Sequence, residues 1–109
     1  MTGAEAGMDV VGKVSGETLY IFLIGELDEH SAPRARRLAD EAIDANAGCA
    51  RAVFDLSGVR FMDSTGIGFL VGRYKRLRRY GIAAALQSVG IAADKVLSMS
   101  GVYALIPKL

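Results

Sequence analysis

The residues best suited to chemistry are the six at 63–68, DSTGIG, where a serine and a threonine stand between an aspartate and two glycines. An apolar pattern with helical spacing begins beside them, so Ser64 stands where a helix N-cap is expected. The first amide groups of a helix lack partners and favour a negative charge nearby. Two interpretations follow for Ser64. Either it caps the helix with its hydroxyl, or it carries a phosphoryl group, which adds about 1.5 to 2 negative charges.

Few other residues suit catalysis or metal binding. The sequence contains one histidine, His30, and one cysteine, Cys49. These two can form neither an intrachain disulfide nor a His/Cys zinc site, and they leave no set of nucleophile, base and acid. The segment DSTGIG also lacks the lysine of a Walker A phosphate-binding loop. We therefore expect a protein that is not an enzyme and that holds no cofactor or metal.

The elements that must position residues 63–68 follow from hydrophobic periodicity. Apolar and β-branched runs predict strands, and apolar residues at helical spacing predict helices. The predicted strands cover 10–14, 18–24, 50–56 and 82–87, with turns at 15–17 and 57–58, and the predicted helices lie between Ser31 and Gly48 and over 63–79 and 91–99. A strand is favoured over a helix for 82–87, whereas for 102–106 the pattern leaves strand and helix open.

The order of these elements predicts the fold class. Strands joined by helical segments of this length pair in parallel through right-handed crossovers, and the first two runs form a hairpin. We expect an α/β fold with one mixed, mostly parallel sheet of four to five strands and helices packed on it, in the order β-β-α-β-α-β-α. Because the run 18–24 is apolar almost throughout, we expect this strand to be covered on both faces.

Length and composition narrow the class of protein. A chain of 109 residues supports a single domain, 1–109, with its core at about 9–106. A hydrophobic content of 51% and a net charge of +1 argue against disorder and against a strongly basic nucleic-acid binder. No run reaches the roughly 18 apolar residues that span a bilayer, so no membrane segment is expected. The start MTGAEAGMDV lacks the regions of a signal peptide, so we expect a cytoplasmic protein.

The net charge of +1 conceals a split along the chain. Residues 1–63 hold 11 acidic and 6 basic side chains, whereas residues 64–109 hold 1 acidic and 7 basic side chains. The basic side chains of the predicted helix 63–79 share one polar face: Arg73, Lys75, Arg76, Arg78 and Arg79. A solvated helix face explains them, and their position near the helix C-terminus suits the helix dipole. They lack the interleaved aromatic residues of a nucleic-acid surface, so we expect no nucleic-acid partner.

Three segments carry a resemblance to a known family. They are GELDEHSA at 25–32, FMDSTGIGFLVGRYKRL at 61–77 and MSG at 99–101. In these segments, and over about 9–106 as a whole, the chain resembles the anti-sigma factor antagonists, which are free-standing STAS domains. The run FMDSTGIG followed by GRYK is most similar to the sporulation members, the anti-sigma F factor antagonists.

The resemblance implies a mechanism called partner switching. In that family the first serine of the D-S-S/T-G motif, here Ser64, is phosphorylated by the anti-sigma factor, a serine kinase that binds ADP or ATP. The unphosphorylated antagonist binds this kinase and so releases the sigma factor, and phosphorylation ends the complex. A phosphatase of the PP2C type restores the active form. Two alternatives stay open: an antagonist of the general stress response with the same mechanism, and an accessory STAS module of a transport system.

The resemblance also implies a set of residues that contact the partner. These are Asp28, His30, Asp63, Thr65, Gly66, Ile67, Gly68 and Arg73. Structural roles compete for several of them. Asp28 and Asp63 also suit the starts of the helices that follow them, and helical spacing also places Ile67 in the core. For Arg73 the alternatives are a solvated face and contact with an acidic patch on the anti-sigma factor.

Overall fold

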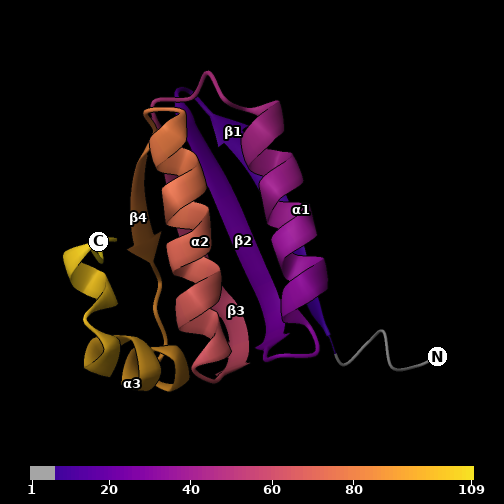
Figure 1. The fold of residues 1–109 in the computed structure, drawn as a ribbon, viewed down its shortest axis with the longest axis vertical. Helices are drawn as coiled ribbons and strands as arrows, with labels where there is room; N and C mark the ends of the chain where they lie inside the picture. Colours follow the sequence, from indigo (N-terminus) through magenta and orange to yellow (C-terminus); the bar gives the residue numbers. More distant parts are fainter. Residues whose placement is uncertain (1–6) are drawn as a thin grey trace.

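The computed structural model describes residues 7–109. Residues 1–6 lie outside the described residues, and they form much of the segment whose composition argues against a signal peptide. The elements follow the predicted order: β1 (Met8–Ser15), β2 (Thr18–Leu27), α1 (Ala32–Ala45), β3 (Arg51–Met62), α2 (Thr65–Arg79), β4 (Ala83–Gln87), α3 (Ile91–Ser100) and a short 3-10 helix (Val102–Ala104). The four strands form one sheet in the order β1-β2-β3-β4, in which β1 is antiparallel to β2 and the other pairs are parallel (Figure 1). The predicted α/β class and mixed sheet are confirmed.

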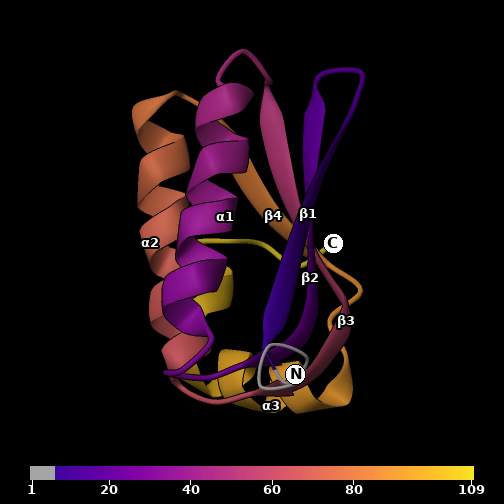
Figure 2. The ribbon, with the colours of Figure 1, turned by 90° about the vertical axis from the view of Figure 1, so that its right-hand side faces the viewer.

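Both long helices lie on one face of the sheet. Figure 2 shows α1 and α2 side by side on that face, with α3 below them at the end of the sheet. Along β2, Leu19, Ile21 and Leu23 are fully buried, whereas Ile24 on the opposite face is 43% exposed. The expectation that this strand is covered on both faces is therefore wrong. Its outward residues are apolar, but no helix of residues 7–109 lies over them (Figure 2).

Small residues let α1 pack closely on the sheet. The buried face of α1 consists of Ala32, Ala35, Ala39 and Ile43. Opposite it on β1, a side chain at Gly12 would bring a Cβ within 3.2 Å of the Cβ of Ala42. Such close packing fixes the axis of α1, and with it the position of the loop that precedes the helix.

The two central strands are longer than predicted. β2 continues through Gly25, whose φ of +123° suits glycine, to Leu27, and β3 continues through the predicted turn at 57–58 to Met62. Register shifts accompany this extension, and the last residues, Leu27 and Met62, still pair. Cross-strand pairing thus overrides the local turn preference of glycine. As a result, β2 and β3 end side by side.

The C-terminal part completes the sheet and the core. The strand predicted over 82–87 is confirmed as β4, and α3 agrees with the helix predicted over 91–99. Residues 102–104 form a 3-10 helix, and Lys108 then forms a parallel bridge with Leu86 of β4. Within residues 7–109, no helix combines the length and the apolar character needed to cross a membrane.

Candidate functional site

Two loops that the sequence places far apart meet at one end of the sheet. β2 leads to Asp28 and β3 leads to Asp63, and the backbone N–H of Asp63 donates a hydrogen bond of 3.3 Å to the carbonyl of Leu27. Both helices that follow these loops begin at this same end (Figure 1). The structure therefore brings the predicted segments 25–32 and 63–68 together, as the carboxyl ends of neighbouring parallel strands require.

Ser64 occupies the N-cap position of α2, but its side chain makes no capping hydrogen bond. The neighbouring carboxylate does so instead, because Oδ1 of Asp63 accepts a hydrogen bond of 2.9 Å from the N–H of Thr65. Ser64 is exposed and Asp63 is half-buried. The interpretation of Ser64 as a capping residue is therefore wrong, and its hydroxyl is open to solvent.

Asp28 organises the loop that precedes α1. Its Oδ1 accepts hydrogen bonds from the N–H groups of His30 (2.9 Å) and Ser31 (3.0 Å). These two hydrogen bonds lower the pKa of the Asp28 carboxyl, and the one from Ser31 has the larger effect. The predicted cap Ser31 makes no capping bond and instead donates from its hydroxyl to the carbonyl of Glu26 at 2.7 Å. Asp28 thus has the structural role that the sequence left open, while His30 is exposed.

The first turn of α2 has a buried side and an open side. Gly66 is buried, and a Cβ there would lie 2.5 Å from Cγ of Met62, so this glycine serves packing. Ile67 is half-buried and packs against the core. By contrast, Gly68 is exposed, and a Cβ there would meet nothing within 4 Å. A partner that approaches this turn therefore contacts Ser64, Gly68 and the exposed part of Thr65.

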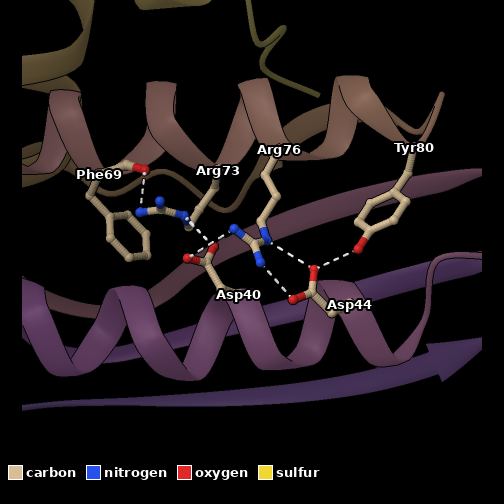
Figure 3. A network of polar contacts seen from close by, with 6 residues as sticks. All are labelled: Asp40, Asp44, Phe69, Arg73, Arg76 and Tyr80. Atoms are coloured by element: carbon tan, nitrogen blue, oxygen red, sulfur yellow. Dashed lines mark hydrogen bonds and ion pairs between the residues drawn. The ribbon is translucent and has the colours of Figure 1, made fainter.

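Arg73 does not belong to an exposed basic face, contrary to the sequence-based expectation. It is only 8% exposed, and its Nε lies 2.7 Å from Oδ1 of Asp40 on α1 (Figure 3). The contact is an ion pair, and these two buried atoms have no hydrogen-bond partner among residues 7–109. Its guanidinium also lies over the ring of Phe69, 5.3 Å from the centroid. Arg73 therefore joins α2 to α1.

A second ion pair joins the same two helices, and it was not predicted from the sequence. The guanidinium of Arg76 donates to both carboxylate oxygens of Asp44, at 2.9 and 2.6 Å, and the hydroxyl of Tyr80 donates to the same carboxylate at 2.8 Å (Figure 3). The hydrogen bond from Arg76, then that from Tyr80, lowers the pKa of Asp44 to about 2. A signal existed in the sequence: acidic residues four apart in one helix and basic residues three apart in the other.

A hollow of about 290 Å³ opens between the two helices beside the first turn of α2. Its lining residues come from both helices: Ala32, Arg36, Thr65, Gly68, Phe69 and Arg73. Three predicted site residues, Thr65, Gly68 and Arg73, therefore share one cavity. Arg36 was not predicted, because nothing in the pattern of α1 distinguishes it from the neighbouring exposed arginines.

Comparison with known proteins places this chain in a family. The model of the STAS domain matches residues 9–109. An anti-sigma F factor antagonist of Paenibacillus polymyxa is 37% identical over 89 residues, which are 82% of this chain and 75% of the relative. An anti-sigma-B factor antagonist of Listeria monocytogenes is 41% identical over 59 residues, which are 54% of this chain and 50% of the relative.

Solved structures agree with these sequence matches. The anti-sigma factor antagonist SpoIIAA in its unphosphorylated form is 26% identical, with a TM-score of 0.74 over 94% of this chain and 88% of that one. The phosphorylated form of this Bacillus cell fate determinant gives a TM-score of 0.66 over 94% and 91% of the two chains. The chain therefore belongs to the STAS domain family, among its anti-sigma factor antagonists, which are regulatory binding proteins and not enzymes.

Proposed function

We propose that this protein is a partner switch controlled by phosphorylation of Ser64. In its unphosphorylated form it binds an anti-sigma factor that is also a serine kinase, with ADP or ATP bound, and so frees the sigma factor. The kinase transfers the γ-phosphoryl group of ATP to the hydroxyl of Ser64, and the complex dissociates. A PP2C-type phosphatase hydrolyses the phosphoserine and restores binding. These steps take place in the cytoplasm.

The observation that carries this proposal is the free hydroxyl of Ser64 at an exposed helix start. Because Asp63 caps α2, phosphorylation of Ser64 removes no hydrogen bond that the fold uses. A relative of the same fold, SpoIIAA, exists in a phosphorylated form. A dianion pressed against a partner without a matching cation costs several kcal/mol, and about 1.4 kcal/mol already weakens binding tenfold.

The docking surface that we propose centres on Ser64 and the exposed edge of α2. It includes Asp63, Thr65, Ile67 and Gly68, together with the loop of Asp28 and His30, which ends beside them. Gly66 and Arg73 are left out because both are buried and serve packing within the chain.

A sigma F pathway of sporulation is the favoured setting. The matched P. polymyxa antagonist is named for the anti-sigma F factor, and its match covers more of both chains than the Listeria match to an anti-sigma-B factor antagonist. A general stress pathway is the second candidate and uses the same mechanism. An accessory STAS module of a transport system is the third, and it predicts no kinase reaction at Ser64.

One experiment tests the central step. The protein is incubated with ATP and the anti-sigma F kinase or, separately, the anti-sigma-B kinase, and the phosphate is mapped by mass spectrometry. We expect one phosphate, on Ser64, and none on a Ser64→Ala variant. Binding of the ADP-loaded kinase, measured by calorimetry, should be lost after phosphorylation and kept by Ser64→Ala. Phosphate on another residue, or on none with either kinase, refutes the proposal.

A further inference from the structure

We propose that Arg36 of α1 receives the phosphate of phosphorylated Ser64, so that the modified side chain docks in the hollow between α1 and α2. This inference rests on the proposed phosphorylation of Ser64. Ser64 directly precedes Thr65, which lines the hollow, and lies one helical turn before Gly68, which also lines it. Because residues four apart in a helix share a face, a phosphate on Ser64 lies on the same face of α2 as Gly68. Arg36 lines the cavity from the other helix.

The usual receptor for such a phosphate, the N-terminus of the helix, is already occupied. The N–H of Thr65 donates to the carboxylate of Asp63 at 2.9 Å. The N–H of Gly66 donates to the carbonyl of Asp63 at 3.0 Å, and that of Ile67 to the carbonyl of Ser64 at 3.1 Å. The amides that would bind an anion at a helix start thus have partners. A phosphate on Ser64 needs a cation from elsewhere.

The charges around the hollow leave Arg36 for this role. The carboxylate of Asp63 adjoins Ser64 and repels a phosphate, and Asp28 directs its carboxylate to the amides of its own loop. Arg73 lines the hollow, but its charge is offset by the ion pair with Asp40. Arg36 is exposed and forms no ion pair with any residue of the part that the structure describes.

Basic side chains without acidic neighbours gather in the first two turns of α1. α1 carries no acidic residue in its first turn, whereas Arg34, Arg36 and Arg37 lie near its N-terminus. Cations at this end of a helix oppose its dipole. Arg34 is compensated by Asp9, whose Oδ1 lies 3.0 Å from its Nη1. For Arg36, which forms no ion pair among residues 7–109, a phosphate that enters the hollow supplies the missing negative charge.

Once attached, the phosphate changes the surface around the hollow. It binds across the hollow, covers the open side of Gly68 and holds Arg36 against the protein. The phosphorylated form then presents a filled and negatively charged surface where the unphosphorylated form presents a cavity and a free guanidinium. Arg36 thereby turns a local modification into a change of shape at the docking surface.

Phosphorus NMR tests this inference without any kinase. Phosphoserine is incorporated at position 64 during translation. The second pKa of the phosphate, which is ordinarily about 6, is then measured by titration. All proteins carry His30→Gln, which removes the sole histidine of the chain. The other charged groups around the phosphate, namely Asp28, Glu29, Asp63, Arg36, Asp40 and Arg73, are the same in every protein compared, except for the one arginine that each variant replaces.

The expected result separates two adjacent arginines of α1. Arg36→Gln should raise the second pKa of the phosphate by about 0.5 or more, because a nearby cation favours the dianion. Arg37→Gln removes the same charge from an exposed residue outside the hollow and should leave the pKa within about 0.1 of its value in the parent protein. Equal shifts in both variants, or none in either, overturn the inference. A kinase that fails to modify Ser64 refutes the proposed function instead, through a separate experiment.

Discussion

At the scale of residues, the sequence offers two roles for Ser64, helix capping and phosphorylation, and the structure gives the first of them to Asp63. Asp63 caps α2, and Ser64 is left with an exposed hydroxyl. This division separates stability from modification. A serine that both capped the helix and accepted a phosphate would lose its capping bond whenever it was modified. Here the fold of α2 does not depend on the state of Ser64.

This division predicts unequal effects of two alanine substitutions. Asp63→Ala removes the cap and should lower the free energy of unfolding by about 1 kcal/mol. Ser64→Ala removes a hydroxyl without an intramolecular role and should change it by no more than about 0.5 kcal/mol. Urea denaturation followed by circular dichroism measures both. A loss from Ser64→Ala as large as that from Asp63→Ala would contradict the structure.

At the scale of elements, α1 and α2 are joined by ion pairs and not by apolar packing alone. Arg73 pairs with Asp40, and Arg76 pairs with Asp44 and lies 3.7 Å from Asp40. Both pairs lie beyond the first turns of the two helices (Figure 3). Arg73 also lines the hollow, so the first pair lies at one side of this cavity. The proposed docking surface therefore lies at the N-terminal ends of two helices that are joined to each other.

The pair of Asp44 and Arg76 predicts a pH dependence of stability. The pKa of Asp44 is lowered from its ordinary value of 3.8 to about 2 in the folded protein, so the unfolded chain binds this proton first as the pH falls. Stability from this group is complete above about pH 4 and is lost as the pH falls towards 2. In an Asp44→Asn variant this part of the dependence should be absent. Melting temperatures between pH 2 and 5 measure it, and parallel curves for both proteins would contradict the assignment.

Alanine in place of a glycine of α2 is expected to raise stability, and at Gly68 it is also expected to weaken binding of the kinase. Gly68 and Gly72 both leave space for a Cβ, so alanine at either position should stabilise the helix by about 0.5 to 1 kcal/mol. Gly68 belongs to the proposed docking surface, so Gly68→Ala should also weaken kinase binding several-fold. Gly72→Ala, one turn further from Ser64, is the control and should bind as the parent does. Denaturation and calorimetry give both quantities, and equal binding by the two variants would remove Gly68 from the surface.

At the scale of the whole molecule, folding brings part of the acidic first half of the chain against part of the basic second half. The acidic residues Asp40 and Asp44 of the first half pair with Arg73 and Arg76 of the second half. What remains is a molecule with a net charge of +1. On this background a single phosphate, with about 1.5 to 2 negative charges, reverses the sign of the net charge.

Electrophoresis makes this reversal measurable. In a native gel at pH 7 the unphosphorylated protein should move slowly towards the cathode, and the protein with phosphoserine at position 64 should move towards the anode. A Ser64→Ala protein treated with kinase and ATP serves as the control and should keep the cathodic mobility. Migration of the phosphorylated form towards the cathode would show that the charge balance is not as described.

Local signals determined most of the fold. The hairpin was predictable because Gly16, with a φ of +61°, stands between two β-branched runs, and α1 and α2 were predictable from apolar spacing. The strand ends were not, because β2 and β3 extend by pairing with each other across Gly25 and Gly58. Pairing of this kind joins residues more than 30 positions apart and leaves no trace in a local pattern.

The sequence by itself thus determined the order of the elements, the mixed sheet and the position of Ser64 at a helix start. These depend on residues within a few positions of one another, where periodicity and turn preference act directly. Only the tertiary structure decided that Asp63 caps α2, that Arg73 is buried against Asp40, and that Arg36 and Thr65 share a hollow. Whether a side chain is exposed or paired depends on which distant helix packs beside it, and that packing is settled by the whole core at once.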